Sequence, residues 1–314
     1  MIYAMITGNA GNQFFQYAFA RKLMLEKNDG LTIDMRYILS GDKVHKAENV
    51  LKYFNTVDFT ESLDGKFYPF QRFLYAFLIR VLPKRDDPKG ILRFEFLKKH
   101  ANLFAKFGLY FYDGADYIEF CKPKKYTKNI FVRGFWECDK YFNDIRDVLL
   151  EEFTPIEPPI AANAELYKKM EETESICVTV RRYDKEEVTD NFFSCDAEFF
   201  YNGVNYIKKY HPNATVFVFS DDVDWCRQNL DFGVDTFYES GKDPIWEKVR
   251  LMSSCKHFVI SNSTFSWWVQ YLSKNVNKIV VAPNEWRRGE CVPIDIYQDS
   301  WIYLDKEGNT VHHK

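Results

Sequence analysis

Two adjacent arginines, Arg181 and Arg182, directly follow an apolar run at residues 176–180 that predicts a buried strand. A guanidinium is always charged and makes forked hydrogen bonds to phosphate oxygens, so this pair at the carboxyl end of a strand suits a diphosphate. Asp184 follows closely enough to orient one arginine or to bond a ligand hydroxyl. A charged turn exposed to solvent is the alternative, and spacing alone leaves both interpretations open.

A second polar group, Ser220-Asp221-Asp222, follows the strand predicted at residues 215–219. Two carboxylates there are able to bind Mg²⁺ together with a nucleotide, to bond a ribose, or to order the loop. Aspartate also caps helices, and a helix is expected at residues 223–228. We therefore expect at least one of the two to be an N-cap.

A third polar group, residues 261–266, follows the strand predicted at residues 257–260. Hydroxyl groups and free N–H groups at a helix N-terminus form an anion site. Simple N-capping by Ser263 or Thr264 is the alternative, and the two roles are compatible because a capping residue is able to face a phosphate as well.

The first half of the chain has a glycine-rich segment, residues 8–13, after a strand predicted at residues 1–7. It lacks the GxGxxG spacing of dinucleotide-binding proteins, so no nicotinamide cofactor is inferred. Its glycines permit tight turns beside a ligand, and its amides suit a hydroxyl-rich acceptor better than a phosphate. The acceptor-side candidates are Gly8, Gly11, Asn12, Gln13 and Gln16.

Strands and helices alternate on both sides of these segments. A strand, a glycine loop, a helix at residues 14–23 and a strand at residues 31–34 make a Rossmann-like opening. Continuous apolar strands alternating with helices predict a parallel sheet covered on both faces in the second half. Ligands of such sheets bind at the carboxyl ends of the strands, where the polar groups described above lie.

The proline-rich stretch at residues 154–159 predicts a stiff linker. We place the domain boundary there, with a Rossmann-like acceptor-side domain at residues 1–154 and a nucleotide-sugar (donor) domain at residues 160–314. Residues 40–128 lack a clean period and are interpreted as helices and loops inserted into the first domain. Two such domains are expected to face each other across a cleft.

Charge and cysteine content exclude several classes of protein. The net charge of −3 gives no global positive field for nucleic acid, and none is expected as a partner. Seven cysteines without a CxxC pair argue against a disulfide framework or a structural zinc site and favour a reducing, cytoplasmic setting. The chain shows neither a signal-peptide pattern nor a membrane-spanning stretch.

The most apolar segment, residues 73–82, is expected to form a buried helix. A membrane-surface helix is the alternative, because Arg80, Lys84 and Arg85 stand beside its aromatic residues. In that case the protein would be peripheral on the inner membrane face.

Several segments resemble one known family in order along the chain. Residues 8–18 (GNAGNQFFQYA) resemble the GGLGNQMFQYA opening of the α-1,2-fucosyltransferases, glycosyltransferase family 11, and residues 178–184 (VTVRRYD) resemble that family's HIRRGD segment. The resemblance covers nearly the whole chain except about residues 40–128. Its other blocks lie at residues 136–142, 219–222, 261–268 and 282–286.

The resemblance implies an α/β fold of the GT-B type, GDP-fucose as donor substrate, inversion at the anomeric carbon, and no obligatory metal or other cofactor. It implies that Arg181 holds the β-phosphate with support from Asp184, and that Asp221 and Asp222 shape the nucleotide pocket, which weakens the Mg²⁺ interpretation. The donor-side candidates are therefore Thr179, Arg181, Arg182, Ser220, Asp221, Asp222, Ser263, Thr264, Phe265 and Ser266.

Two positions depart from the family pattern: its histidine is Thr179 here, and its glycine is Tyr183. Threonine does not titrate near neutral pH as an imidazole does, and Tyr183 adds bulk beside the phosphates. Glu186 and Glu187 are the nearest candidates for the base that takes the acceptor proton, with a solvated acidic turn as the alternative for each.

The sequence thus predicts transfer of L-fucose in α-1,2 linkage to a galactose-containing glycan, an O-antigen or a lipid-linked precursor. Two alternatives stay open. One is a transferase that uses another GDP-sugar, and the other is a non-catalytic relative that binds a glycan or a nucleotide.

Overall fold

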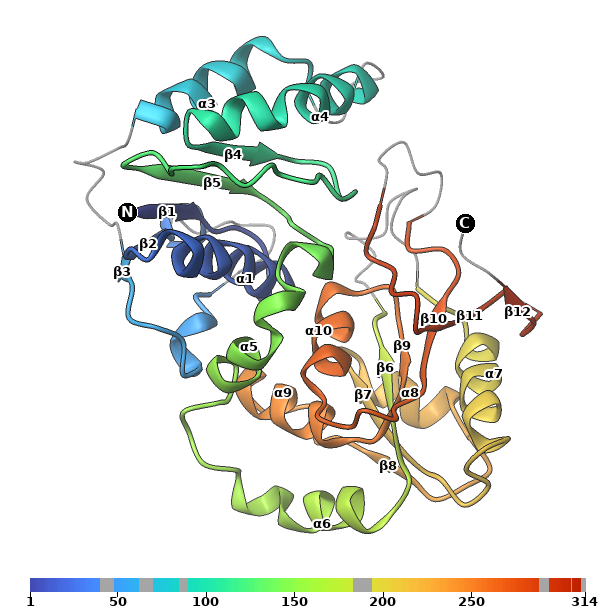
Figure 1. Ribbon diagram of the computed structural model, residues 1–314. Coiled ribbons are helices and arrows are strands. Elements are labelled where there is room, and N and C mark those ends of the chain that lie inside the picture. The colour runs from blue at the N-terminus through green and yellow to red at the C-terminus, as the bar shows by residue number, and fades with distance from the viewer. Residues whose placement is uncertain are drawn as a thin grey trace. The chain divides into compact units, whose positions relative to one another are not determined.

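The computed structural model describes residues 1–39, 48–61, 70–84, 90–182, 194–287, 294–305 and 307–311 (Figure 1). The chain divides into two compact units. Unit 1 comprises Met1–Lys52, Thr56–Glu152 and Cys291–Ile296, and unit 2 comprises Tyr53–Asn55, Phe153–Glu290 and Tyr297–Lys314.

Unit 1 is built on a five-stranded sheet of order β3-β2-β1-β5-β4, in which every pair is parallel. Parallel strands need crossovers that cover the sheet, and β2 and β4 are accordingly buried along their whole length. The strands are β1 (Ile2–Met5), β2 (Leu31–Asp34), β3 (Thr60–Glu61), β4 (Leu109–Tyr112) and β5 (Ile130–Gly134).

Helices cover both faces of this sheet. Phe19 of α1 contacts Tyr110 at 6.0 Å between ring centroids, whereas Tyr75 of α3 contacts Phe111 at 4.9 Å. Because successive residues of a strand point to opposite faces, α1 and α3 lie on opposite sides of β4. The helices and 3₁₀ turns of unit 1 are α1 (Ala10–Lys27), α2 (Arg36–Leu39), α3 (Phe70–Val81), α4 (Gly90–Lys106), η2 (Asp139–Tyr141), η3 (Asn143–Ile145) and α5 (Arg146–Glu152), and η1 (Leu51–Tyr53) spans the boundary between the units.

Three expectations for this half were wrong. Residues 73–82, expected to form a buried helix, belong mostly to α3, in which Leu78 is the one buried residue and Phe73 and Phe77 are more than half exposed. Residues 109–112 form the buried strand β4, so the stretch at 40–128 contains more than helices and loops. The helix predicted from residue 14 begins at Ala10, which places Gly11, Asn12 and Gln13 in its first turn rather than in a loop. The first N–H groups of a helix have no intrahelical partner in any case, so poor helix formers such as Gly11 and Asn12 are tolerated there.

Unit 2 holds a seven-stranded sheet of order β12-β11-β10-β9-β6-β7-β8. Its described strands pair in parallel, except that β12 is antiparallel to β11. The strands are β6 (Ser175–Val180), β7 (Thr215–Ser220), β8 (Thr236–Tyr238), β9 (His257–Ile260), β10 (Val280–Pro283), β11 (Ile302–Leu304) and β12 (Thr310–Val311). The expected α/β class is confirmed.

The two faces of the unit 2 sheet carry different helices. Val178 and Val180 belong to a buried cluster with Phe200 and Val204 of α7, whereas the neighbouring Thr179 bonds Ser266 of α10. The chain therefore leaves β6 toward one face and β9 toward the other. The helices are η4 (Ala161–Asn163), α6 (Ala164–Glu172), α7 (Ala197–Lys208), α8 (Val223–Asn229), α9 (Ile245–Ser254) and α10 (Thr264–Leu272).

Candidate active site

The strand order of unit 2 reverses between β6 and β9. From β6 the chain proceeds to β7 and β8 on one side, and it then returns to β9 on the other side of β6 (Figure 1). Connections leave such a switch point toward opposite faces of the sheet, so a crevice opens at the carboxyl ends of the two strands, where open α/β sheets bind ligands. Arg181 and Arg182 follow β6, and Ser263 and Thr264 follow β9.

Asp221, at the end of the neighbouring strand β7, orients the arginine pair. Its Oδ2 accepts a hydrogen bond from Arg181 Nη1 at 2.6 Å, and its Oδ1 accepts one from the Arg182 backbone N–H at 2.8 Å. The side chains of Arg181 and Asp221 each remain 29% exposed. Asp221 thus holds a guanidinium at the edge of the sheet while leaving it accessible to a ligand.

Arg182 is positioned differently from its neighbour. Its guanidinium carbon lies 3.7 Å from the centre of the Trp225 ring of α8, a cation–π stack. Trp225 was not predicted as a site residue, because nothing in the sequence indicates which aromatic side chain of α8 turns toward the loop after β6.

Ser220 and Asp222 shape the loop after β7. The Ser220 hydroxyl donates to the Val180 carbonyl and accepts the Asp222 N–H, each at 2.9 Å. Asp222 Oδ1 accepts the Trp225 N–H at 2.9 Å and caps α8, as expected for at least one of the two aspartates. Both Asp221 and Asp222 therefore have protein partners.

Thr179 and Ser266 form part of a buried hydroxyl cluster between β6 and α10. Thr179 Oγ1 donates to Ser266 Oγ at 2.8 Å and accepts the Ser261 N–H at 3.0 Å. The hydroxyls of Ser261 and Ser266 lie 3.2 Å apart, and all three residues are buried. These contacts hold the start of α10 against the end of β6. Thr179 and Ser266 therefore position α10, and their buried side chains are not exposed to solvent.

The N-terminus of α10 lies at the same edge. Ser263, one of the two residues expected to cap this helix, occupies the N-cap position, although its side chain makes no capping hydrogen bond. Ser263, Thr264 and Phe265 are half-buried. The first-turn N–H groups of α10 are thus placed beside the crevice with their partial positive charge directed out of the helix.

Glu239 is a further charged residue at this edge that sequence reasoning missed. It directly follows β8, its Oε1 accepts the Ser220 N–H at 2.8 Å, and its Oε2 lies 3.0 Å from Lys248 Nζ. Burial raises the pKa of Glu239, and the charge of Lys248 opposes that shift. Glu239 supports the loop that carries Asp221.

The acceptor-side candidates lie in unit 1 at the corresponding switch point, between β1 and β5. Gly8 has a φ of +79°, and a β-carbon there would lie 2.7 Å from Asn12 Nδ2, so the position requires glycine. Gly11 is buried in α1, and Asn12 is half-buried.

Gln13 and Gln16 are buried, and their amides bond the backbone. Gln13 Nε2 donates to the carbonyls of Gly8 and Glu48, and its Oε1 accepts the Val50 N–H. Gln16 bonds both the N–H and the carbonyl of Thr7. These contacts shape the loop, and an acceptor role for either side chain stays a prediction.

A family model described as Glycosyl transferase family 11 matches residues 1–305. The chain belongs to glycosyl transferase family 11. It is similar to an α-1,2-colitosyltransferase of Escherichia coli, at 27% identity over 98% of this chain and 99% of that protein. It is also similar to the O-antigen biosynthesis glycosyltransferase WbnK of Escherichia coli, at 26% identity over 96% of this chain and 100% of that protein.

Among solved structures, this family 11 glycosyltransferase is similar to the NodZ α-1,6-fucosyltransferase soaked with GDP-fucose. The TM-score is 0.50 at 14% sequence identity, over 86% of this chain and 91% of that chain. At such identity the likeness shows a shared fold. The expected GT-B type, α/β with two Rossmann-like parts, is confirmed, and so is the family resemblance read from the motifs.

Four predicted residues of this glycosyltransferase lie outside the described residues: Tyr183, Asp184, Glu186 and Glu187. The support for Arg181 expected from Asp184 and the base expected at Glu186 or Glu187 therefore stay predictions. Among the described residues, Asp221 performs the orienting task that the sequence assigned to Asp184.

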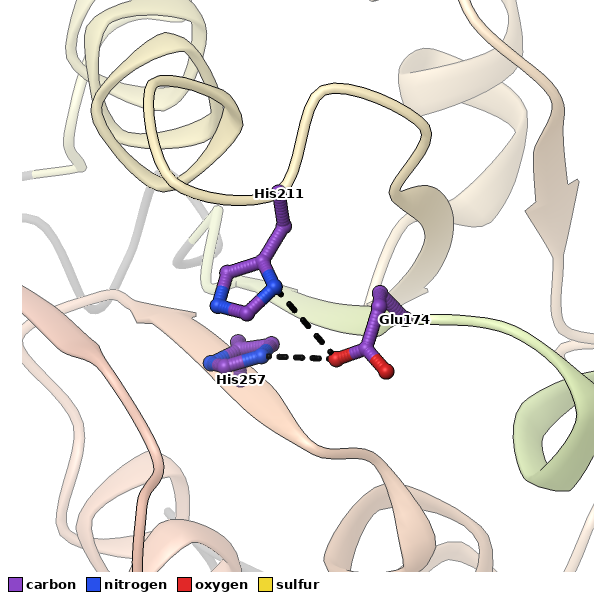
Figure 2. Close-up of side chains that lie close together, drawn as sticks. All are labelled: Glu174, His211 and His257. Atoms are coloured by element: carbon purple, nitrogen blue, oxygen red, sulfur yellow. Dashed lines mark hydrogen bonds and ion pairs between the residues drawn. The ribbon is translucent and has the colours of Figure 1, made fainter.

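Glu174, His211 and His257 form a cluster with metal-ligand chemistry at the amino ends of the unit 2 strands (Figure 2). Glu174 Oε2 lies 3.3 Å from His257 Nε2 and 3.5 Å from His211 Nδ1. His257 Nδ1, however, accepts the Ile279 N–H at 3.1 Å, so the neutral ring carries its proton on the Nε2 that faces Glu174. The protonated Nε2 has no free lone pair with which to bind a metal ion. The cluster is therefore better explained as a hydrogen-bonded group of side chains than as a metal centre.

A small pocket of about 80 Å³ lies in unit 1, lined by residues of α1 and of the segment at 117–126 together with Tyr110, Lys140 and Tyr141. None of the predicted site residues lines it. The strand-end chemistry, rather than this cavity, therefore identifies the candidate active site.

Proposed function

We propose that this family 11 glycosyltransferase transfers L-fucose from GDP-fucose, in α-1,2 linkage and with inversion, to a galactose-containing glycan such as an O-antigen or a lipid-linked precursor. One observation carries the proposal. Arg181, whose Nη1 donates to Asp221 Oδ2 at 2.6 Å, lies at the β6–β9 switch point, and α10 begins at the same point.

Two observations support a GDP-sugar as donor: the positive charge at the strand ends and the similarity to fucosyltransferases. A partly exposed guanidinium and a helix N-terminus both favour a bound diphosphate. The similar NodZ structure was soaked with GDP-fucose, and the motifs resemble those of α-1,2-fucosyltransferases. The α-1,2 linkage is supported by the similar colitosyltransferase, and an O-antigen acceptor by the similar WbnK.

In the proposed reaction the acceptor hydroxyl attacks the anomeric carbon of fucose from the face opposite GDP. The new C–O bond forms as the bond from that carbon to the β-phosphate oxygen breaks, which inverts the anomeric configuration. Arg181 and the first-turn N–H groups of α10 stabilise the charge that grows on the leaving GDP. The hydroxyl proton passes to a carboxylate, for which Glu186 and Glu187 are the candidates, and no metal is required.

A second donor is favoured by one specific observation. A relative that matches over nearly its full length is named an α-1,2-colitosyltransferase. Thr179 and Tyr183, the two departures from the family pattern, both belong to the donor-side segment, where a change in sugar preference is expected to arise.

A transfer assay with GDP-fucose, GDP-colitose and GDP-mannose, each with acceptors that end in β-galactose, separates these donors. We expect GDP-fucose to give the highest kcat/KM and an α-1,2-linked product, identified by mass spectrometry and NMR. A preference for GDP-colitose would establish the second donor. Nucleotide binding without a glycosylated product from any donor would contradict both and identify a non-catalytic relative.

A further inference from the structure

An exposed apolar stripe runs along α3. Phe70, Phe73, Phe77 and Val81 are spaced by three and four residues, which places them on one face of the helix. Each of the four is more than half exposed. A helix that packs one face on a sheet normally carries polar residues on the face exposed to solvent. The exposed face of α3 is apolar instead.

A matching stripe runs along α4 and the residue that follows it. Leu92, Phe96, Leu103 and Phe107 fall on one face and are 37% to 58% exposed. The opposite face of α4, which includes Leu97, is buried, and α4 packs against β4 of the sheet. The exposed stripe is therefore additional to the apolar face that the fold uses.

Two hydrogen bonds place the two helices side by side. Gln71 Nε2 at the start of α3 donates to the Phe107 carbonyl after α4, at 2.9 Å. Arg93 Nη1 near the start of α4 donates to the Pro83 carbonyl after α3, at 2.8 Å. The two helices thus run antiparallel as neighbours in unit 1 (Figure 1), and we call their two exposed stripes together the α3–α4 surface.

The charged residues around the α3–α4 surface are mostly positive. Arg80, Lys84, Lys99 and Lys106 are exposed there, and Glu95 is the one acidic residue within residues 70–84 and 90–107. Residues 85–89, which lie outside the described residues, contain two cationic and two acidic residues and therefore leave the net charge unchanged. Exposed aromatic residues flanked by arginine and lysine are the composition of interfacial helices on anionic membranes.

We propose that the α3–α4 surface binds the headgroup region of an anionic lipid bilayer. In the described part of the chain no helix is long and apolar enough to cross a membrane, so the contact is peripheral. Phenylalanine side chains enter the boundary between headgroups and acyl chains, and Arg80, Lys99 and Lys106 contact lipid phosphates. The proposal does not depend on which sugar is transferred.

A second copy of the chain fits the charge pattern less well. A two-fold interface pairs the same surface with itself, which would bring the cations of one copy toward those of the other with only Glu95 to offset them. Like charges across an interface oppose association, whereas anionic headgroups neutralise them.

Co-sedimentation of the full chain with vesicles tests the proposal. We expect binding to vesicles of phosphatidylcholine mixed with phosphatidylglycerol, weaker binding at high salt, and little binding to phosphatidylcholine alone. Phe73→Ser/Phe77→Ser should reduce the partition coefficient by at least about tenfold, because two exposed aromatic side chains no longer insert. The matched control, Tyr210→Ser/Val276→Ser, removes exposed apolar residues of unit 2 and should bind as the wild type does.

A second set tests the charges. Arg80→Gln/Lys99→Gln/Lys106→Gln should weaken binding by about fivefold for each cation, whereas Lys124→Gln/Lys125→Gln/Lys274→Gln should not. Far-ultraviolet circular dichroism checks that each variant is folded. Absent binding by the wild type, or equal binding by the α3–α4 variants and their controls, overturns the proposal. A further result would also overturn it: the wild type forms a dimer and does not bind vesicles, and Phe73→Ser/Phe77→Ser converts that dimer to a monomer. Such a result would assign the α3–α4 surface to a second copy of the chain.

Discussion

Arg181 and Asp221 stand at the carboxyl ends of the neighbouring strands β6 and β7, joined by a hydrogen bond of 2.6 Å from Nη1 to Oδ2. The same carboxylate accepts the Arg182 N–H, so one side chain fixes both the backbone and the guanidinium of this segment. The arginine is therefore oriented before any ligand binds, as electrostatic stabilisation of a leaving group requires.

This pairing predicts that Asp221 acts through Arg181. Asp221→Asn keeps an acceptor for the Arg182 N–H but removes the charge, and we expect kcat/KM to fall about tenfold. In an Arg181→Ala background the same change should have little further effect, because the partner is already absent. A double-mutant cycle on kcat/KM measures the coupling, and additive effects of the two changes would refute the pairing as functional.

The hydroxyl cluster predicts a stability effect at Thr179. Thr179→Val removes the hydroxyl that accepts the Ser261 N–H and donates to Ser266, and it leaves that N–H only its bond to the Thr179 carbonyl at 3.2 Å. The free energy of unfolding should fall by about 1 kcal/mol. Thr179→Ser retains the hydroxyl and serves as the matched control. Urea denaturation measures both variants, and equal stability of Thr179→Val and wild type would show that the cluster does not hold α10 in place.

The N-cap at Asp222 predicts a local structural role rather than metal binding. Asp222→Ala should lower the free energy of unfolding by about 1 kcal/mol, and Asp222→Ser, which keeps a capping oxygen, by less. Transfer activity of the wild type should be the same with Mg²⁺ and with EDTA. Activity that is lost in EDTA and restored by Mg²⁺, but not restored in Asp222→Ala, would instead make Asp222 a metal ligand.

The cluster of Figure 2 predicts a pH dependence of stability. Burial lowers the pKa of His257, with partial opposition from its bond to Glu174, and Lys256 and His211 also face this site. Because the unfolded chain binds the proton more tightly, the contribution of His257 is complete above its usual pKa of about 6.5 and is lost as the pH falls below it. The loss is at most about 1.4 kcal/mol per pH unit for one proton.

Glu174 acts at lower pH. Its partial burial would raise its pKa, but hydrogen bonds from His257 and Lys256 outweigh burial and lower it, so its contribution is lost only as the pH falls below the usual glutamate range. His257→Asn keeps an acceptor near Nδ1 for the Ile279 N–H but does not titrate. Urea unfolding from about pH 7.5 to 5.5 should show a shallower slope for this variant than for wild type. Identical slopes would contradict the assignment.

Much of the donor-side arrangement could be predicted from the sequence. β6, β7 and β9 are continuous apolar runs, each followed at once by polar residues, and the structure places those residues at one edge of one sheet. Local chemistry sufficed there, because buried parallel strands and their carboxyl ends are recognisable in short windows. The cap at Asp222 was predictable for the same reason.

The partners of these residues were not predictable. Asp221 pairs with Arg181 because β6 and β7 pair in parallel with Val180 opposite Ser220, a register that joins residues 40 positions apart in sequence. Glu239 and Trp225 depend on tertiary packing in the same way. In unit 1, β4 was missed because its four residues lie within a long aromatic stretch where no period distinguishes strand from helix.

The central claim is that Arg181 holds the diphosphate of a GDP-sugar at the β6–β9 switch point. Calorimetric titration of GDP into the wild-type chain and into Arg181→Ala tests it most directly. We expect the wild type to bind GDP and the variant to bind at least about tenfold more weakly, since a charged hydrogen bond to phosphate is lost. Equal affinity of the two proteins for GDP, or no binding by the wild type, would contradict the account.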